Sequence, residues 1–235
     1  MVNDPEGPIQ PASQVPARSL NDHLVNVMKA VLSSAPFCGG IASLMNDYIP
    51  NRRVERIEAF ARDVASSLSK VQGRIEDERI LTDEYAHLFE RCFKGAADFP
   101  QQEKIEAFRG ILVNSLLPSD LSEDQKEFFL SLVERLSPIH LRVVRFMGDP
   151  RGYLAAMEIR EDRIRGGFRN FFPIAIPGVT LEVLVAAFAD LHRLGFTNTS
   201  ADIFHTTTAG QGLELLGDQL TPLAKQFVAF CQAPA

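Results

Sequence analysis

The spacing of apolar residues constrains this chain most, because they recur at every third or fourth position through most of the sequence. The clearest example begins near Arg52 and contains Val54, Ile57, Phe60, Ala61, Val64, Leu68 and Val71. This spacing places one side of an α-helix against a core and leaves the polar side in water. Between residues 19 and 147, no stretch alternates with the period of two that is typical of a β-strand. The sequence therefore predicts an all-α fold.

Residues that start helices divide this apolar pattern into separate segments. Thr82 and Ser122 are suited to cap helices, and Gln125 completes a capping box three residues after Ser122. Ser137 followed by Pro138 starts a further short helix, since proline is favoured at the first helical position. These signals predict a multi-helix bundle with short connections.

The composition suggests four regions along the chain. Residues 1–18 are polar and proline-rich, without the apolar core of a secretory signal, and we expect them to form a disordered arm. The helical bundle is expected over 19–147. A basic linker is expected over 148–178, because this range is rich in arginine and contains Gly-Gly and Pro-Gly pairs. Residues 179–235 form the C-terminal region.

That C-terminal region resembles the second half of a winged-helix module. A helix capped by Thr180 stops at Gly195, an irregular stretch follows, and a last helix starts at Thr221 and Pro222. A small winged-helix-like domain is therefore expected over 179–235. Residues 180–235 contain two basic side chains against five acidic ones. Because DNA binding needs clustered Lys and Arg, we expect this region to contact protein rather than nucleic acid.

Overall composition excludes several classes of protein. The chain has 235 residues, of which 46% are hydrophobic, and a net charge of −6, so it has no general attraction to nucleic acid or acidic membranes. Its cysteines, Cys38, Cys92 and Cys231, are far apart and match neither a disulfide framework nor a metal site. We therefore expect a cytoplasmic protein with no metal and no cofactor.

The arginine-rich range is the first candidate binding site. Four arginines fall within ten residues, beside two adjacent phenylalanines: Arg160, Arg163, Arg165, Arg169, Phe171 and Phe172. Arginine with exposed aromatic rings can bind RNA or another protein. The alternative, which we favour, is that the phenylalanines pack into a seam between domains.

A candidate catalytic pair lies at the end of the bundle. Arg135 and His140 have the Arg-x4-His spacing of helical HEPN-type ribonucleases, in which the arginine would stabilise phosphate charge and the histidine would move a proton. Here Leu136 follows the arginine in place of the usual polar residue, and Pro138 breaks the helix between the pair. We therefore favour a helix end over an active site.

A third candidate lies near the N-terminus, where Pro36, Gly39 and Gly40 interrupt an apolar stretch. Small residues allow helices to approach closely, so these three predict a kinked packing site. The alternative is that residues 24–48 insert into a membrane, as in helical cell-death effectors. The stretch falls short of the roughly 20 apolar residues of a membrane-spanning helix.

Several short motifs occur in a familiar order along residues 24–230. They are Pro-Phe-x-Gly-Gly-Ile from Pro36, Tyr-Ile-Pro-x-Arg-Arg from Tyr48, Glu-Lys-Ile from Glu103, Leu-Ser-Pro-Ile-His from Leu136 and Leu-Gly-Phe from Leu194. This order resembles uncharacterised bacterial helical proteins of the Abi-alpha (abortive infection) type. The resemblance implies an association with phage defence or stress, and it carries over no catalytic residues.

Three hypotheses about function arise from these patterns. The first is a non-enzymatic interaction protein, an adaptor or effector with a protein partner, because no nucleophile, base and metal ligands converge in the sequence. The second is a nucleic-acid binder or HEPN-like ribonuclease, and the third is a membrane-acting helical effector. The apolar stripes are compatible with either a monomer or a dimer.

Overall fold

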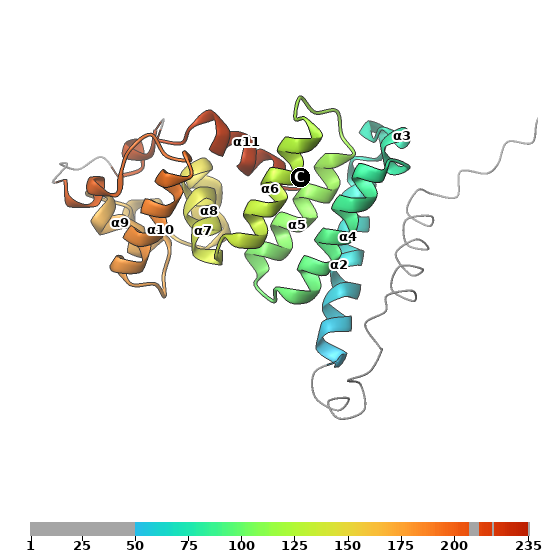
Figure 1. The fold of residues 1–235 in the computed structure, drawn as a ribbon. Helices are drawn as coiled ribbons and strands as arrows, with labels where there is room; N and C mark the ends of the chain where they lie inside the picture. The colour runs from blue at the N-terminus through green and yellow to red at the C-terminus, as the bar shows by residue number, and fades with distance from the viewer. Residues whose placement is uncertain (1–49, 207–211, 218, 235) are drawn as a thin grey trace, which may run out of the picture.

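The computed structural model describes residues 50–206, 212–217 and 219–234, and these ranges are helical (Figure 1). They contain ten α-helices: α2 (Pro50–Lys70), α3 (Asp77–Ile80), α4 (Asp83–Asp98), α5 (Gln102–Ser115), α6 (Glu123–Arg135), α7 (Pro138–Gly148), α8 (Pro150–Ala156), α9 (Phe168–Ala175), α10 (Leu181–Arg193) and α11 (Pro222–Cys231). Four short 3-10 helices lie at Gln72–Arg74, Glu161–Arg163, Ala201–His205 and Gly212–Leu216. The predicted all-α class is confirmed.

The described C-terminal residues contain no β-strand. One isolated antiparallel bridge joins Thr197 and Leu220, on either side of the irregular stretch between α10 and α11. Two 3-10 helices, Ala201–His205 and Gly212–Leu216, lie within the described part of that stretch. A winged helix normally contains strands, so the winged-helix prediction is not confirmed. The described residues show only that the C-terminal region is helical.

The predicted caps set the helix boundaries. The side-chain oxygen of Thr82 accepts a hydrogen bond from the backbone N–H of Tyr85 (3.2 Å), and Ser122 and Gln125 form the expected capping box. At α11, Thr221 accepts from the backbone N–H of Ala224 (3.3 Å). These bonds satisfy amides that have no partner inside the helix.

The helices form two groups that share one core. In Figure 1, α2, α4, α5 and α6 lie side by side at one end and α7–α10 at the other, with α11 running between them. The last helix packs on both α5 and α7. The buried apolar residues from Phe60 to Phe230 form a single continuous cluster. The boundary predicted between the bundle and the C-terminal region is thus crossed by α11.

A glycine and an asparagine on α5 receive the end of α11. A Cβ atom on Gly110 would lie 2.1 Å from the carbonyl oxygen of Cys231, so the two backbones meet where α5 has no side chain. One turn further on, the Asn114 Nδ2 lies 3.2, 2.9 and 2.9 Å from the carbonyl oxygens of Ala229, Phe230 and Gln232. These contacts fix the C-terminal end of α11 on α5.

Candidate functional site

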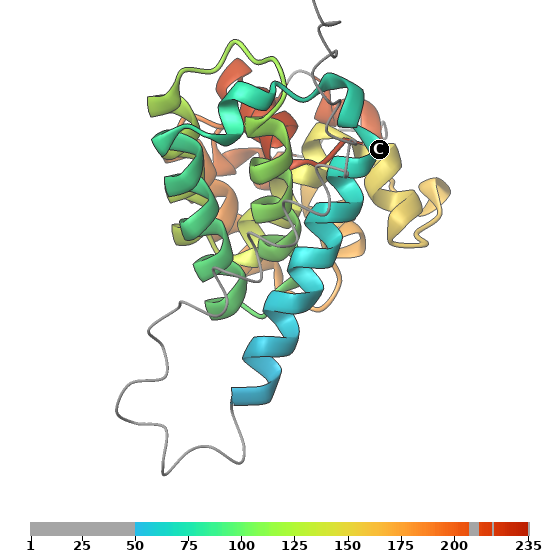
Figure 2. The ribbon, with the colours of Figure 1, turned by 90° about the vertical axis from the view of Figure 1, so that its right-hand side faces the viewer.

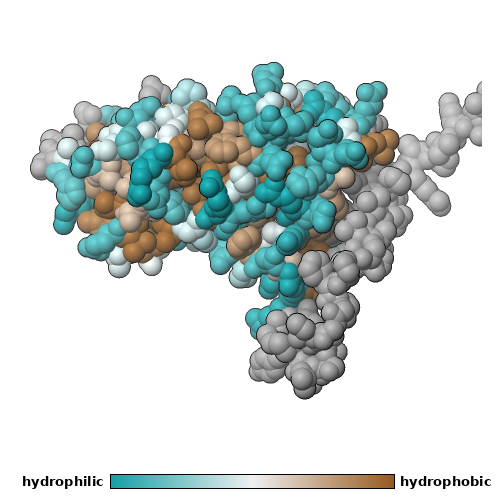
Figure 3. All heavy atoms as spheres, in the orientation of Figure 1, coloured by the Kyte–Doolittle hydropathy of each residue, from teal (hydrophilic) through white to brown (hydrophobic). Residues whose placement is uncertain are grey.

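Few large apolar side chains among the described residues are well exposed. Figure 3 shows many hydrophilic side chains on this side of the molecule, with hydrophobic ones gathered where the two groups of helices meet and over the lower part of the end that holds α9 and α10. The large apolar side chains that are most exposed lie on separate elements: Val54, Leu81, Phe128, Met157 and Val183. Apolar residues scattered singly are normal for a soluble protein surface. The charged side chains are therefore the better candidates for a functional site.

The candidate catalytic pair is separated by the break between α6 and α7. Arg135 is the last residue of α6 and is exposed, whereas the side chain of His140 is 15% exposed. The His140 Nδ1 lies 2.7 Å from the Ser137 hydroxyl oxygen and accepts from the Ser137 backbone N–H (3.2 Å). Its Nε2 lies 3.4 Å from a carboxylate oxygen of Asp190 on α10. Both ring nitrogens are therefore occupied by contacts that cap α7 and join it to α10.

No hydrogen bond or ion pair between the described residues links Arg135 to His140. A general base needs a ring nitrogen that can reach the proton it removes. The two nitrogens of His140 instead contact Ser137 and Asp190, and Asp190 also pairs with Arg193 at 2.6 Å. The described geometry is that of a helix cap, with the arginine exposed to solvent.

The arginine-rich range contains a segment that stands out from the body of the protein. Residues 150–165, which comprise α8, a short loop and the 3-10 helix Glu161–Arg163, protrude at the right of Figure 2. We call this segment the Arg-rich projection. Four arginines on it are exposed: Arg151, Arg160, Arg163 and Arg165. Met157 adds an apolar side chain that is 42% exposed.

Two of these arginines are paired and two are not. Arg151 lies 3.7 Å from a carboxylate oxygen of Glu161, and Arg160 forms an ion pair with Asp162. Arg165 donates only to a backbone carbonyl, that of Asp162, at 2.7 Å. The backbone N–H of Arg163 donates to the Arg160 carbonyl (3.1 Å), but its guanidinium has no hydrogen bond or ion pair to any residue that the structure describes. The projection thus offers two guanidinium groups, Arg163 and Arg165, that pair with no carboxylate in the described part of the chain.

The projection is shaped by a left-handed residue at the end of α8. Glu158 has φ = 55°, a conformation that favours glycine. The backbone N–H of Ile159 donates to the carbonyl of Leu154 (2.9 Å), which closes the last turn and sends the chain away from the helix. A non-glycine residue at positive φ costs about 1–2 kcal/mol.

The remaining residues of the predicted binding set lie on α9, inside the range predicted as a linker. Arg169 is exposed, but Phe171 and Phe172 are 0% exposed. Their rings contact Phe146 at 6.1 and 5.4 Å between centroids, and Phe172 also contacts Phe204 at 5.1 Å. A ligand at the surface meets the arginines and not these rings. The burial of the phenylalanines also explains why an eight-residue helix forms here despite Pro173.

The third candidate set, Pro36, Gly39 and Gly40, lies outside the described residues, as do the rest of residues 24–48 and the arm over 1–18. No helix in the described part is long and apolar enough to cross a membrane. Nor do the histidines, cysteines and carboxylates of the described ranges form a group that could hold a metal ion.

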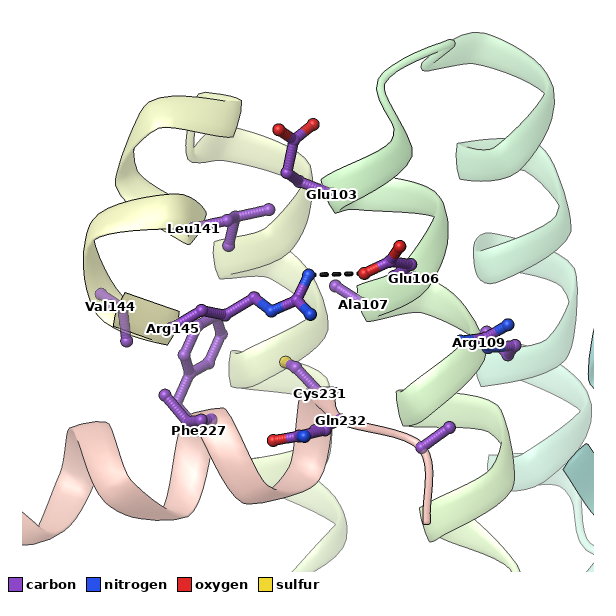
Figure 4. A pocket seen from close by; sticks show the side chains of 12 residues that line it. Glu103, Glu106, Ala107, Arg109, Leu141, Val144, Arg145, Phe227, Cys231 and Gln232 are labelled. Atoms are coloured by element: carbon purple, nitrogen blue, oxygen red, sulfur yellow. Dashed lines mark hydrogen bonds and ion pairs between the residues drawn. The ribbon is translucent and has the colours of Figure 1, made fainter. Parts of the chain in front are cut away.

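A cavity of about 160 Å³ lies where α5, α7 and α11 meet (Figure 4). We call its apolar lining the floor and its charged and polar lining the rim. The floor comprises Ala107, Leu141, Val144, Phe227, Val228, Cys231 and Ala233, and the rim comprises Glu103, Glu106, Arg109, Arg145 and Gln232. An apolar floor with a few charged groups at its edge is the usual arrangement of a small-molecule site.

Ion pairs between α5 and α7 bridge this cavity. Arg145 reaches across from α7 to the carboxylate of Glu106, as Figure 4 shows, and the Arg142 Nε lies 3.8 Å from a carboxylate oxygen of Glu103. Arg109 lies at the opposite rim in that view. Its Nε is buried without a hydrogen-bond partner among the described residues.

This cavity could not be predicted from the sequence. Its residues come from three helices, and Glu103 and Gln232 are more than a hundred positions apart. Each charged residue taken alone has the pattern of an ordinary helix surface. The one local signal in the sequence is the Glu-Lys-Ile motif at Glu103, and the motif alone does not indicate a function.

The chain matches no family model, no curated protein and no solved structure. Its function is therefore inferred from its fold and from the charged groups of the projection and the cavity.

Proposed function

We propose that this protein is a non-enzymatic interaction protein whose Arg-rich projection contacts an acidic surface of a protein partner. The observation that carries the proposal is that Arg163 and Arg165 face no carboxylate among the described residues, on a segment that protrudes from the body (Figure 2). Arginine is favoured at interfaces, because its planar group can bind carboxylates with two parallel hydrogen bonds.

The charge of the projection favours protein over nucleic acid as the partner. Residues 150–165 contain four arginines against three acidic residues. A phosphate backbone is bound by clustered positive charge, and the acidic residues here would repel it. A protein surface carries both signs and can pair with both. Met157 supports this choice, because methionine adapts to irregular apolar contacts.

Charge reversal tests the proposal. The wild-type protein and the double variant Arg163→Glu, Arg165→Glu would be purified from the native host at moderate salt, and the bound material identified and quantified. We expect a stoichiometric protein with the wild type and its loss with the variant. The matched control is Arg62→Glu with Arg74→Glu, since both arginines are exposed on other elements. Equal recovery with both double variants would refute a role for the projection.

Recovered nucleic acid would instead favour the second function, a nucleic-acid binder, particularly if its affinity falls steeply with added salt. Degradation of that nucleic acid, abolished by Arg135→Ala or His140→Ala, would replace our proposal with a HEPN-like ribonuclease. The contacts of His140 with Ser137 and Asp190 are the observation that speaks against this alternative.

Three finer expectations remain proposals. An association with phage defence or stress is supported only by the Abi-alpha resemblance. A winged-helix-like arrangement of residues 179–235 is supported by the order of α10, the Thr197–Leu220 bridge and α11. A membrane-acting role would depend on residues 24–48, and liposomes that neither bind the protein nor leak would count against it.

A further inference from the structure

We propose that the cavity between α5, α7 and α11 binds a small amphipathic anion, with its charged head at Arg109 and its apolar chain on the cavity floor. This site is independent of the Arg-rich projection, which comprises residues 150–165 and contributes no residue to it. The inference rests on the size of the cavity, on its lining and on the pairing of its charged groups.

The size of the cavity limits the ligand. A volume of about 160 Å³ is roughly half of the lower limit for pockets that hold drug-sized molecules. It suits a head group with a chain of a few carbon atoms. The side chains of Leu141, Val144 and Phe227 give such a chain an apolar floor, and burying it there is favourable by the hydrophobic effect.

The pairing of charges decides the sign of the head group. Both cavity glutamates already face an arginine, since Glu106 pairs with Arg145 and Glu103 lies near Arg142. Arg109 is left with no acceptor among the described residues, and its Nε is buried. The buried Nε cannot be reached from the cavity, so a ligand would meet the terminal nitrogens of the guanidinium, which are not among the buried unpartnered atoms. An anionic ligand supplies the acceptor that the Arg109 guanidinium lacks, whereas a cation would find both carboxylates already engaged.

Glu106 opposes the anion that we propose. Its carboxylate lies on the rim and would repel a negative head group, and it also engages Arg145, which would otherwise attract that group. Removing this charge while keeping the shape of the side chain should therefore strengthen the binding of an anion. The same change would weaken the binding of a cation, so Glu106→Gln distinguishes the two ligand classes.

The experiment is calorimetric titration of the purified full chain with three probes of equal chain length: hexanoate, hexanol and hexylammonium. We expect saturable binding of hexanoate and weaker or no binding of the other two. Arg109→Gln should lower the affinity for hexanoate by about tenfold or more, because a hydrogen bond to a charged group contributes about that much. Glu106→Gln should raise that affinity about threefold, because Arg145 is freed from a partly exposed ion pair.

Arg74→Gln is the matched control, because Arg74 is exposed on the 3-10 helix Gln72–Arg74 and should leave the affinity unchanged. Hexanoate binding that Arg109→Gln does not change would overturn the proposal. So would tighter binding of hexylammonium, or no saturable binding of hexanoate by the wild type. Because the probes are titrated into the wild type as well, the proposal stays testable even where a variant does not fold.

Discussion

Replacing Gly110 by alanine is expected to push α11 away from α5. The added Cβ would lie 2.1 Å from the Cys231 carbonyl oxygen, 2.3 Å from its carbonyl carbon and 2.8 Å from the Gln232 nitrogen. All three are backbone atoms, so no side chain can rotate to make room. Ordinary contact begins near 3.4 Å, and the gap from 2.1 to 3.4 Å requires a shift of about 1.3 Å.

This shift breaks the contacts that hold the end of α11. The Asn114 bonds to the carbonyls of Ala229, Phe230 and Gln232, now 2.9–3.2 Å, would exceed hydrogen-bonding distance. This amide group has two N–H donors, so at most two full bonds are lost, at about 1–3 kcal/mol together, and overpacking adds about 1–3 kcal/mol. Alanine returns about 1 kcal/mol through its helix propensity. We therefore expect Gly110→Ala to lower the free energy of unfolding by about 1–5 kcal/mol.

Urea unfolding measures the total effect, and hydrogen exchange of the α11 amides shows where it acts. Gly73→Ala is the matched control, because a Cβ at Gly73 meets nothing within 4 Å, and it should leave the protein as stable as the wild type or up to about 1 kcal/mol more stable. The reasoning is refuted if Gly110→Ala is as stable as the wild type and its α11 amides exchange hydrogen as slowly as those of the wild type. Asn114→Ala combined with Gly110→Ala should cost less than the sum of the two single changes, since both act on the same contact.

Tyr85→Phe should raise the free energy of unfolding by about 1 kcal/mol, because its buried hydroxyl has no hydrogen-bond partner among the described residues; a loss of stability in urea would contradict this. Glu158→Gly should stabilise the protein by up to about 1 kcal/mol by relieving the positive φ, and an unchanged or lower Tm in calorimetry would argue against it. Burial raises the pKa of the Cys92 thiol, so the unfolded chain loses this proton first and stability falls as the pH rises above about 9, by roughly 1.4 kcal/mol per pH unit. Cys92→Ala should flatten that fall in urea titrations at about pH 8–10.5, and a slope equal to that of the wild type would show the attribution to be wrong.

The parts of the fold that depend on local chemistry could be predicted from the sequence. Thr82, Ser122 and Thr221 start helices because their hydroxyls accept hydrogen bonds from amides three positions ahead. Gly195 ends α10 because the chain there takes φ = 73°. Each of these signals lies within one turn of the helix end that it sets, so a linear pattern is sufficient to find it.

Features that depend on distant packing could not be predicted in this way. The arginines and phenylalanines of 160–172 are interspersed in sequence, but folding sends the arginines to the surface and the rings into the core with Phe146, Phe188 and Phe204. His140 has the spacing of a catalytic residue and serves as part of a cap. The cavity is missed for the same reason, since its walls come from three helices that only the tertiary structure brings together.

The position of α11 has a consequence for how the chain folds. Its contacts with Asn114 join positions that are 115 to 118 residues apart in the sequence. Forming these contacts therefore costs the conformational entropy of closing a very long loop. We expect this step to come late, after the local helix pairs have formed. During synthesis the ribosome releases α5 well before α11, and until then the side of α5 that packs against α11 has no cover. A chain paused between these two helices should therefore be a preferred substrate for chaperones, more so than the released chain, in which α11 can pack on α5.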